Sequence, residues 1–147
     1  MKQEDFIILD ELRKNSRRSL TEIGNLTNVT LSSVFKKVEK MEKKLIKKYV
    51  SLLSFENAGF SIRISLALKS KDRESLKKFL LEHPNVNSVY RTSQGYDFFV
   101  ETVFPNMLSF ENFMEQVSSV TSDKKIFHII EDLRLEDFNL VQDGSSK

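Results

Sequence analysis

The residues best suited to chemistry in this chain are the hydroxyl and lysine side chains of one short stretch, TLSSVFKKVEKMEKK, which covers residues 30–44. A lysine ammonium group binds phosphate oxygens as a point charge, and a hydroxyl group hydrogen-bonds to phosphates or to base edges. The same composition also suits the solvated side of an ordinary helix. The positions of the apolar residues decide whether the lysines gather on one side.

Apolar residues recur in this stretch at helical spacing, which predicts a helix with one buried stripe. The stripe consists of Val34, Val38, Met41 and Leu45. Leu31, Phe35 and Glu42 lie on one flank of it. At about 100° per residue, the opposite side carries Ser32, Lys36, Glu39, Lys40 and Lys43. We therefore expect a helix that can lie against an anionic partner.

Two further helices are expected upstream. Phe6, Leu9 and Leu12 form one face of a helix that ends near Asn15. A capping box, Ser19 followed by Glu22, starts a short second helix. Its apolar positions are Leu20, Ile23 and Leu26.

The turn after the second helix completes a recognisable plan. Asn28 tolerates the left-handed backbone of a tight turn, and Thr30 is placed to cap the third helix. Helix, short helix, turn and lysine-bearing helix is the order of a helix-turn-helix domain, here residues 1–48. The candidate DNA-binding residues are Arg17, Ser19, Thr30, Leu31, Ser32, Ser33, Lys36, Lys37 and Lys40.

The second half alternates between strand and helix patterns. A linker strand is expected at residues 49–59, then strands and helices in the order β-α-β-β-α-β over residues 60–140, and a polar tail at residues 141–147. The last strand is expected within KKIFHIIEDLRL, residues 124–135. This order predicts a ferredoxin-like antiparallel sheet with both helices on one face, so the fold class is α+β.

The other face of that sheet is expected to be apolar as well. Phe98 and Phe99 are adjacent and therefore point to opposite faces. In the last strand, the pair Ile126 and Ile130 alternates with the pair Phe127 and Ile129. Strands that are apolar on both sides need cover on both sides, so we predict a homodimer through this domain.

Charge is distributed unevenly along the 147 residues. Residues 1–50 carry twelve Lys and Arg against seven Asp and Glu, whereas residues 51–147 carry eleven against fourteen. A basic front suggests a module that faces a polyanion. No apolar run approaches the roughly 18–20 residues of a membrane helix, so we expect no membrane partner. The absence of cysteine excludes thiolate metal sites and fits a reducing cytosol.

Over nearly its whole length, the sequence resembles the Lrp/AsnC family of transcription regulators. The family's opening pattern D-x-x-I-L-x-x-L-x-x-[DN]-[GA]-R resembles DFIILDELRKNSR, which matches it at Asp5, Ile8, Leu9, Leu12, Asn15 and Arg17, and its S-x-x-E-[LI] is matched by SLTEI. KVEKMEKKLI resembles the pattern R-V-x-x-L-E-x-x-G-x-I at the end of the family's recognition helix, with lysine for arginine. The resemblance implies cytoplasmic dimers, often assembled into octamers, that bind double-stranded DNA.

The resemblance also implies a small effector, such as an amino acid, bound near a turn that usually reads TGDYD. Here the turn reads SQGYD, residues 93–97, so Gln94 takes the usual glycine position. Gly95 can still supply a positive φ angle, and we expect Gly95 and Asp97 to contact the effector. The glycine that usually ends the recognition helix is absent, which predicts that Lys43 or Lys44 caps its last carbonyls.

Enzymatic and architectural roles are the alternatives. The chain offers only His83 and His128 for acid–base or metal chemistry, and we expect His83 to be a cation at a helix end. Some Lrp-like proteins are decarboxylases of sirohaem-derived tetrapyrroles. A DNA-compacting protein of low sequence specificity is also open, because lysine lacks arginine's bidentate contact to guanine. We expect no catalytic residue, no metal and no cofactor.

Overall fold

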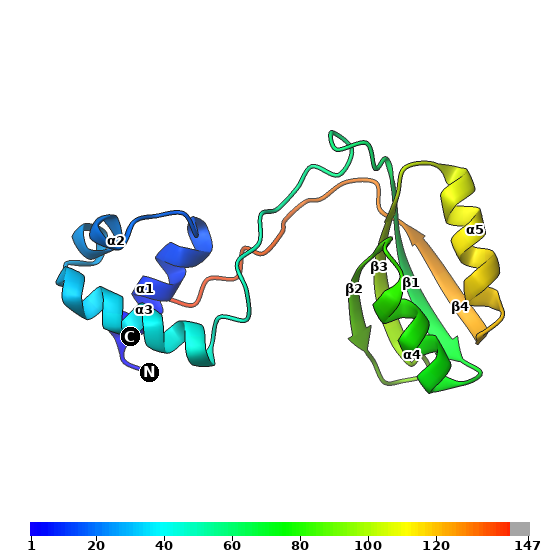
Figure 1. Cartoon of the computed structure of the whole chain (residues 1–147), viewed down its shortest axis with the longest axis horizontal. Helices are drawn as coiled ribbons and strands as arrows, with labels where there is room; N and C mark the ends of the chain where they lie inside the picture. Colours follow the sequence, from blue (N-terminus) through cyan, green and yellow to red (C-terminus); the bar gives the residue numbers. More distant parts are fainter. Residues whose placement is uncertain (142–147) are drawn as a thin grey trace, which may run out of the picture. The chain divides into compact units, whose positions relative to one another are not determined.

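The computed structural model describes residues 1–141, and these form two compact units (Figure 1). The helical unit consists of residues 1–51 together with the C-terminal segment that starts at Arg134. The sheet unit consists of Leu52–Leu133. Residues 134–140, expected in the sheet domain, belong with the helices, and the expected linker of residues 49–59 is divided between the two units after Ser51. Of the expected polar tail, residues 142–147 lie outside the described residues.

The helical unit contains the three predicted helices, α1 (Gln3–Lys14), α2 (Leu20–Thr27) and α3 (Leu31–Lys44). Their apolar stripes meet in one core, made of Ile8, Leu12, Ile23, Val34, Val38 and Met41. Leu45 was expected in this stripe but is 48% exposed, because α3 has ended before it. Ile46 packs against the core in its place.

The helix ends follow the predicted pattern with two exceptions. The Ser19 hydroxyl accepts a hydrogen bond from the Glu22 N–H, and Asn28 is left-handed with φ 56°. Thr30 occupies the N-cap of α3, but its side chain makes no capping hydrogen bond. At the other end, the backbone N–H groups of Leu45 and Ile46 both donate to the Met41 carbonyl. No lysine caps this end.

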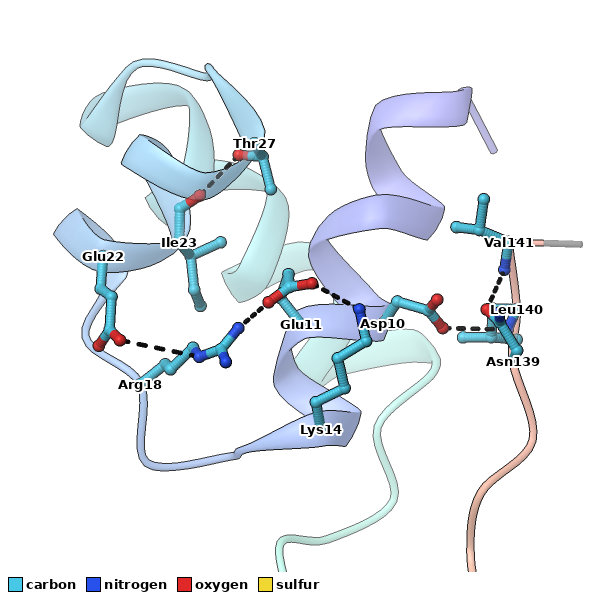
Figure 2. A network of polar contacts seen from close by, with 10 residues as sticks. All are labelled: Asp10, Glu11, Lys14, Arg18, Glu22, Ile23, Thr27, Asn139, Leu140 and Val141. Carbon is cyan, nitrogen blue, oxygen red and sulfur yellow. Dashed lines mark hydrogen bonds and ion pairs between the residues drawn. The ribbon is translucent and has the colours of Figure 1, made fainter. Parts of the chain in front are cut away.

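A polar network fixes α1 to its neighbours (Figure 2). Arg18 forms ion pairs with Glu11 of α1 and Glu22 of α2. On the other side of α1, the buried Asp10 accepts a hydrogen bond of 3.0 Å from the Leu140 N–H. The C-terminal segment therefore lies against α1 and is part of the helical unit.

The sheet unit has the predicted βαββαβ order. Its elements are β1 (Ile62–Ser70), α4 (Arg73–Glu82), β2 (Val86–Arg91), β3 (Phe98–Phe104), α5 (Met107–Ser118) and β4 (Thr121–His128). The strands lie in the order β2-β3-β1-β4, and every pair is antiparallel. Alternate residues of β1 and β3, such as Leu66 and Val100, pack against α4 and α5 in a second core, so both helices cover the same face.

Two strand predictions were wrong in extent. Residues 49–59 contain no strand, since residues 49–54 pair with no neighbouring strand and residues 55–59 form a turn. β4 ends at His128, which lies opposite Ile64 near the start of β1. One more bond follows, from the Ile129 N–H to the Arg63 carbonyl, although β1 itself begins at Ile62. Ile130 lies beyond the end of β4, is 96% exposed and belongs to neither sheet face.

The sheet face opposite α4 and α5, called the open face here, carries aromatic side chains. Phe99 lies opposite Ala67 on β1 and opposite Tyr90 on β2, with its ring 6.5 Å from the Tyr90 ring. Phe127 of β4 lies opposite Ser65. Tyr90 and Phe127 are 52% and 48% exposed, so the structure confirms an apolar area on this face. Within residues 1–141, no helix combines the length and apolar character needed to cross a membrane.

Candidate nucleic-acid interface

The outer face of α3 comprises Ser32, Lys36, Glu39, Lys40 and Lys43, and all five are exposed. The opposite side of the same helix buries Val34, Val38 and Met41 in the core. Burial of this stripe holds α3 in place and fixes its orientation about the helix axis. In this orientation the lysines face solvent. The arrangement can bind an anionic surface without any rearrangement of the unit.

Basic residues from two elements line a cavity beside the outer face. The cavity has a volume of about 680 Å³, and we call it the basic groove. It is lined by Met1, Lys2, Asp5, Ser33, Lys36, Lys37, Lys40, Met41, Lys44 and Leu45. Lys2 and Lys44 were not among the candidates that sequence reasoning selected. No local pattern could select Lys2, because only the fold brings the N-terminal residues next to α3.

Lys37 differs from the other lysines of the groove. Its ammonium group lies 2.5 Å from an Asp5 carboxylate oxygen and 3.3 Å from Glu4, and its side chain is only 20% exposed. The hydrogen bond from Lys37 holds the pKa of Asp5 below its ordinary value, and the same bond raises the pKa of Lys37. Lys37 thus ties α1 to α3, and its charge is already neutralised.

Arg17 and Ser19 precede α2. Both are exposed, and the Ser19 hydroxyl keeps its own proton free for donation because its oxygen is the acceptor of the N-cap bond. Arg18, between them, is occupied by its two glutamate partners. Of the two adjacent arginines, only Arg17 is therefore presented outward.

Leu31 and Phe35 form an apolar flank beside the outer face. They are 51% and 56% exposed, although the buried stripe of the same helix lies next to them. Leu31 was a candidate contact from sequence, whereas Phe35 was assigned only to a flank of the stripe. The sequence did contain a signal that Phe35 stays outside the core, because the apolar stripe of α3 is too narrow to include it.

The candidate effector turn joins β2 to β3. Gln94 and Gly95 both have positive φ angles, 69° and 104°, so the turn forms as predicted even with glutamine at the usual glycine position. The Asp97 carboxylate accepts hydrogen bonds from the Ser70 N–H at 2.8 Å and the Ser70 hydroxyl at 2.6 Å, and it pairs with Arg73 at 3.1 Å. These bonds, from Ser70 above all, lower the pKa of Asp97 to about 2.

The turn therefore gives its two predicted residues different surroundings. Asp97 joins the end of β1 to the start of α4, and its carboxylate oxygens already have partners from the chain itself. Gly95 is exposed, and a Cβ atom built on it meets nothing within 4 Å.

Comparison with known proteins identifies the sheet unit first. Residues 60–127 match the family model described as Lrp/AsnC ligand binding domain. An HTH-type transcriptional regulator of Pyrococcus abyssi, itself uncharacterized, is 33% identical over 122 residues, which are 79% of each chain. This chain belongs to the Lrp/AsnC family of transcriptional regulators. The HTH-type transcriptional regulator FL11 of Pyrococcus furiosus is 26% identical over 119 residues, again 79% of each chain.

Solved structures of this family share the fold of the regulator. LrpC of B. subtilis has a TM-score of 0.85 at 23% identity and covers 91% of this chain and 97% of its own. A transcriptional regulator of Neisseria meningitidis, solved as a complex with L-Met, has a TM-score of 0.82 at 16% identity over 92% and 93% of the two chains. These likenesses extend over both units.

One of the two histidines of the regulator does not have the expected surroundings. His83 is the C-cap of α4, but burial lowers its pKa, and its Nδ1 atom accepts a hydrogen bond from the Asn85 N–H. The imidazole packs against the Phe113 ring at 4.8 Å. The expectation of a cation at this helix end was therefore wrong, because the ring is used as a neutral acceptor. His128 is exposed in β4, with its ring 6.2 Å from that of Phe110.

Proposed function

We propose that this regulator binds double-stranded DNA by placing the outer face of α3 in the major groove. The observation that carries the proposal is the two-sided character of α3, which buries its apolar stripe and exposes hydroxyl and lysine side chains. Thr30, Ser32, Ser33 and Lys36 stand in the first turns, where a recognition helix contacts base edges. The similar proteins are named HTH-type transcriptional regulators, which supports the same role.

Phosphate contacts are assigned to the surrounding cations. Lys40, Lys2 and Lys44 border the basic groove, and Arg17 and Ser19 stand at the start of α2. Such contacts fix the register of a protein on the duplex without reading its sequence. Lys37 is left out of this set, because Asp5 and Glu4 already neutralise it.

The decisive experiment measures affinity for a duplex selected from a random pool and for an unselected duplex of the same length, at one fixed salt concentration. A specific regulator binds the selected duplex at least about 10³-fold more tightly. If the two affinities are nearly equal, the protein is an architectural DNA-binding protein and not a sequence-specific regulator. Failure to bind either duplex would remove DNA binding altogether.

We also propose that the chain acts as a homodimer through the open face of the sheet, and that such dimers are the units of an octamer. Tyr90, Phe99 and Phe127 supply an apolar area that lies on the face without helices. A second copy would cover it and would bring a second α3 to a second half-site. Analytical ultracentrifugation should find a dimer for wild-type protein and for the control Leu108→Glu, but a monomer for Phe127→Glu. Equal masses for all three would contradict the interface.

A small effector, such as an amino acid, is proposed for the sheet unit. The match to a ligand binding domain and the L-Met complex of the Neisseria meningitidis protein support it. Asp97 shapes the turn, and Gly95 leaves it open to an approaching ligand. A thermal-unfolding screen against the twenty standard amino acids should raise the Tm for at least one, because a ligand that binds the native state stabilises it. Gly95→Asn should reduce that shift, and twenty null results would contradict an amino-acid effector.

A further inference from the structure

The apolar flank of α3, Leu31 and Phe35, lies outside the core of the helical unit. Leu31 and Phe35 are 51% and 56% exposed, while the neighbouring Val34 and Val38 fill the core. The two flank residues are four positions apart, so they lie together on one side of the helix. Large side chains left half in water on a recognition helix have gained little from folding, which points to burial against a partner.

The polar side chains of α3 offer few ways to tell one base from another. The helix contains no arginine, asparagine or glutamine, the residues that form bidentate contacts with guanine and adenine. Its serines can hydrogen-bond to any base, and its lysines act as point charges. Glu39 could accept from cytosine, but it is paired with Lys43 at 2.7 Å. The hydrogen-bonding residues therefore leave most of the discrimination unexplained.

The positive charge of the lysines near the flank indicates what kind of partner covers it. Lys36 adjoins Phe35 in the sequence, and Lys2, Lys40 and Lys44 line the basic groove on the other side of the outer face. A partner that meets these cations and the apolar flank at once must be anionic with apolar groups at its surface. The major groove of DNA has this chemistry wherever it contains thymine, whose 5-methyl group is exposed there.

We propose that Leu31 and Phe35 read the 5-methyl groups of thymine, and that they give this regulator its main direct base discrimination. The inference rests on the proposed binding of α3 in the major groove. Burial of one methyl group is worth about a fourfold change in affinity. Contacts with one methyl group for each side chain would give about a 16-fold preference in each half-site.

The test uses deoxyuridine, which differs from thymidine only by the missing methyl group. A duplex is selected from a random pool with wild-type protein, and each thymine is then replaced singly by deoxyuridine. Wild-type protein should lose about fourfold in affinity at one or two positions of each half-site. The loss at those positions should disappear in Phe35→Ala or Leu31→Ala. It should persist in the control Leu81→Ala, which removes a leucine that is 64% exposed in the sheet unit.

The outcomes separate this inference from the proposed function. If wild-type protein binds the selected duplex but no deoxyuridine replacement weakens binding, thymine reading is overturned and DNA binding stands. Methyl effects that survive in both flank variants overturn it as well. If no duplex binds, the proposed function fails first. Circular dichroism melts of the variants should match wild type, since both side chains lie outside the core.

Discussion

Alanine substitution of two neighbouring lysines of α3 should affect different properties, the salt dependence of DNA binding in one case and the stability of the fold in the other. Lys36 lies on the outer face, whereas Lys37 is held by Asp5 at 2.5 Å. Each phosphate that a protein neutralises contributes about −0.9 to the slope of log affinity against log salt concentration. Lys36→Ala should therefore reduce the magnitude of the slope by about 0.9. When the salt concentration rises fourfold, from about 50 to about 200 mM, the ratio of the wild-type affinity to the variant affinity should fall by about 3.5-fold.

Lys37→Ala should leave the slope unchanged and lower the stability instead. The lost bond joins two side chains that are each 20% exposed, so we expect a cost of about 1–2 kcal/mol in the free energy of unfolding. Asp5 has a lowered pKa, so its contribution is fully present above its ordinary value of 3.8. The stability difference between wild type and Lys37→Ala should therefore shrink as the pH falls below that value. Because the pKa of Lys37 is raised, the difference should also shrink as the pH rises above the ordinary lysine value of 10.5.

Fluorescence anisotropy against a selected duplex at several salt concentrations measures the slopes, and urea unfolding measures the stabilities. The matched design makes the outcome unambiguous, because the two substitutions remove the same charge one position apart. The reasoning fails if Lys36→Ala keeps the wild-type slope, or if Lys37→Ala changes the slope as much as Lys36→Ala is expected to.

Three further predictions concern the positions that hold each unit together. Gly24→Ala should cost about 1–3 kcal/mol in urea unfolding, because its Cβ atom would lie 2.8 Å from the Val29 carbonyl oxygen; an unchanged midpoint would contradict this. Asp97→Asn should destabilise the protein near neutral pH, and the difference should vanish as the pH falls from 3.8 through about 2, since the folded-state pKa is depressed; a pH-independent difference would refute it. Asp10→Ala should cost about 1–3 kcal/mol and speed amide exchange at Leu140, whose N–H loses its acceptor; unchanged exchange there would argue against the contact.

The local predictions succeeded where one chain segment determines the outcome. The stripe of Val34, Val38 and Met41 correctly predicted which side of α3 is buried, and Asn28 correctly predicted the left-handed turn before it. The alternation of Ile64, Leu66 and Leu68 gave the buried face of β1. These signals are strong because period and backbone preference act within a few residues.

The predictions that failed depended on a partner elsewhere in the chain. β4 ends where its pairing with β1 stops, at Ile64, and residues 49–59 contain no strand because no neighbour pairs with them. The ion pair that occupies Lys37 comes from α1, 32 positions earlier. Docking of the C-terminal segment depends on Asp10, 130 positions before Leu140. No short pattern in the sequence announces such contacts.

The most direct test of the central claim asks whether the outer face of α3 meets the duplex. The chain has no cysteine, so Glu39→Cys gives a single site for an iron–EDTA cleavage reagent on that face, and Glu111→Cys gives a matched site on α5. The reagent at position 39 should cut the selected duplex at a few adjacent nucleotides in each half-site, and the reagent at position 111 should cut weakly or diffusely. Equal cutting from both positions, or none from position 39 while the duplex stays bound, would contradict the account.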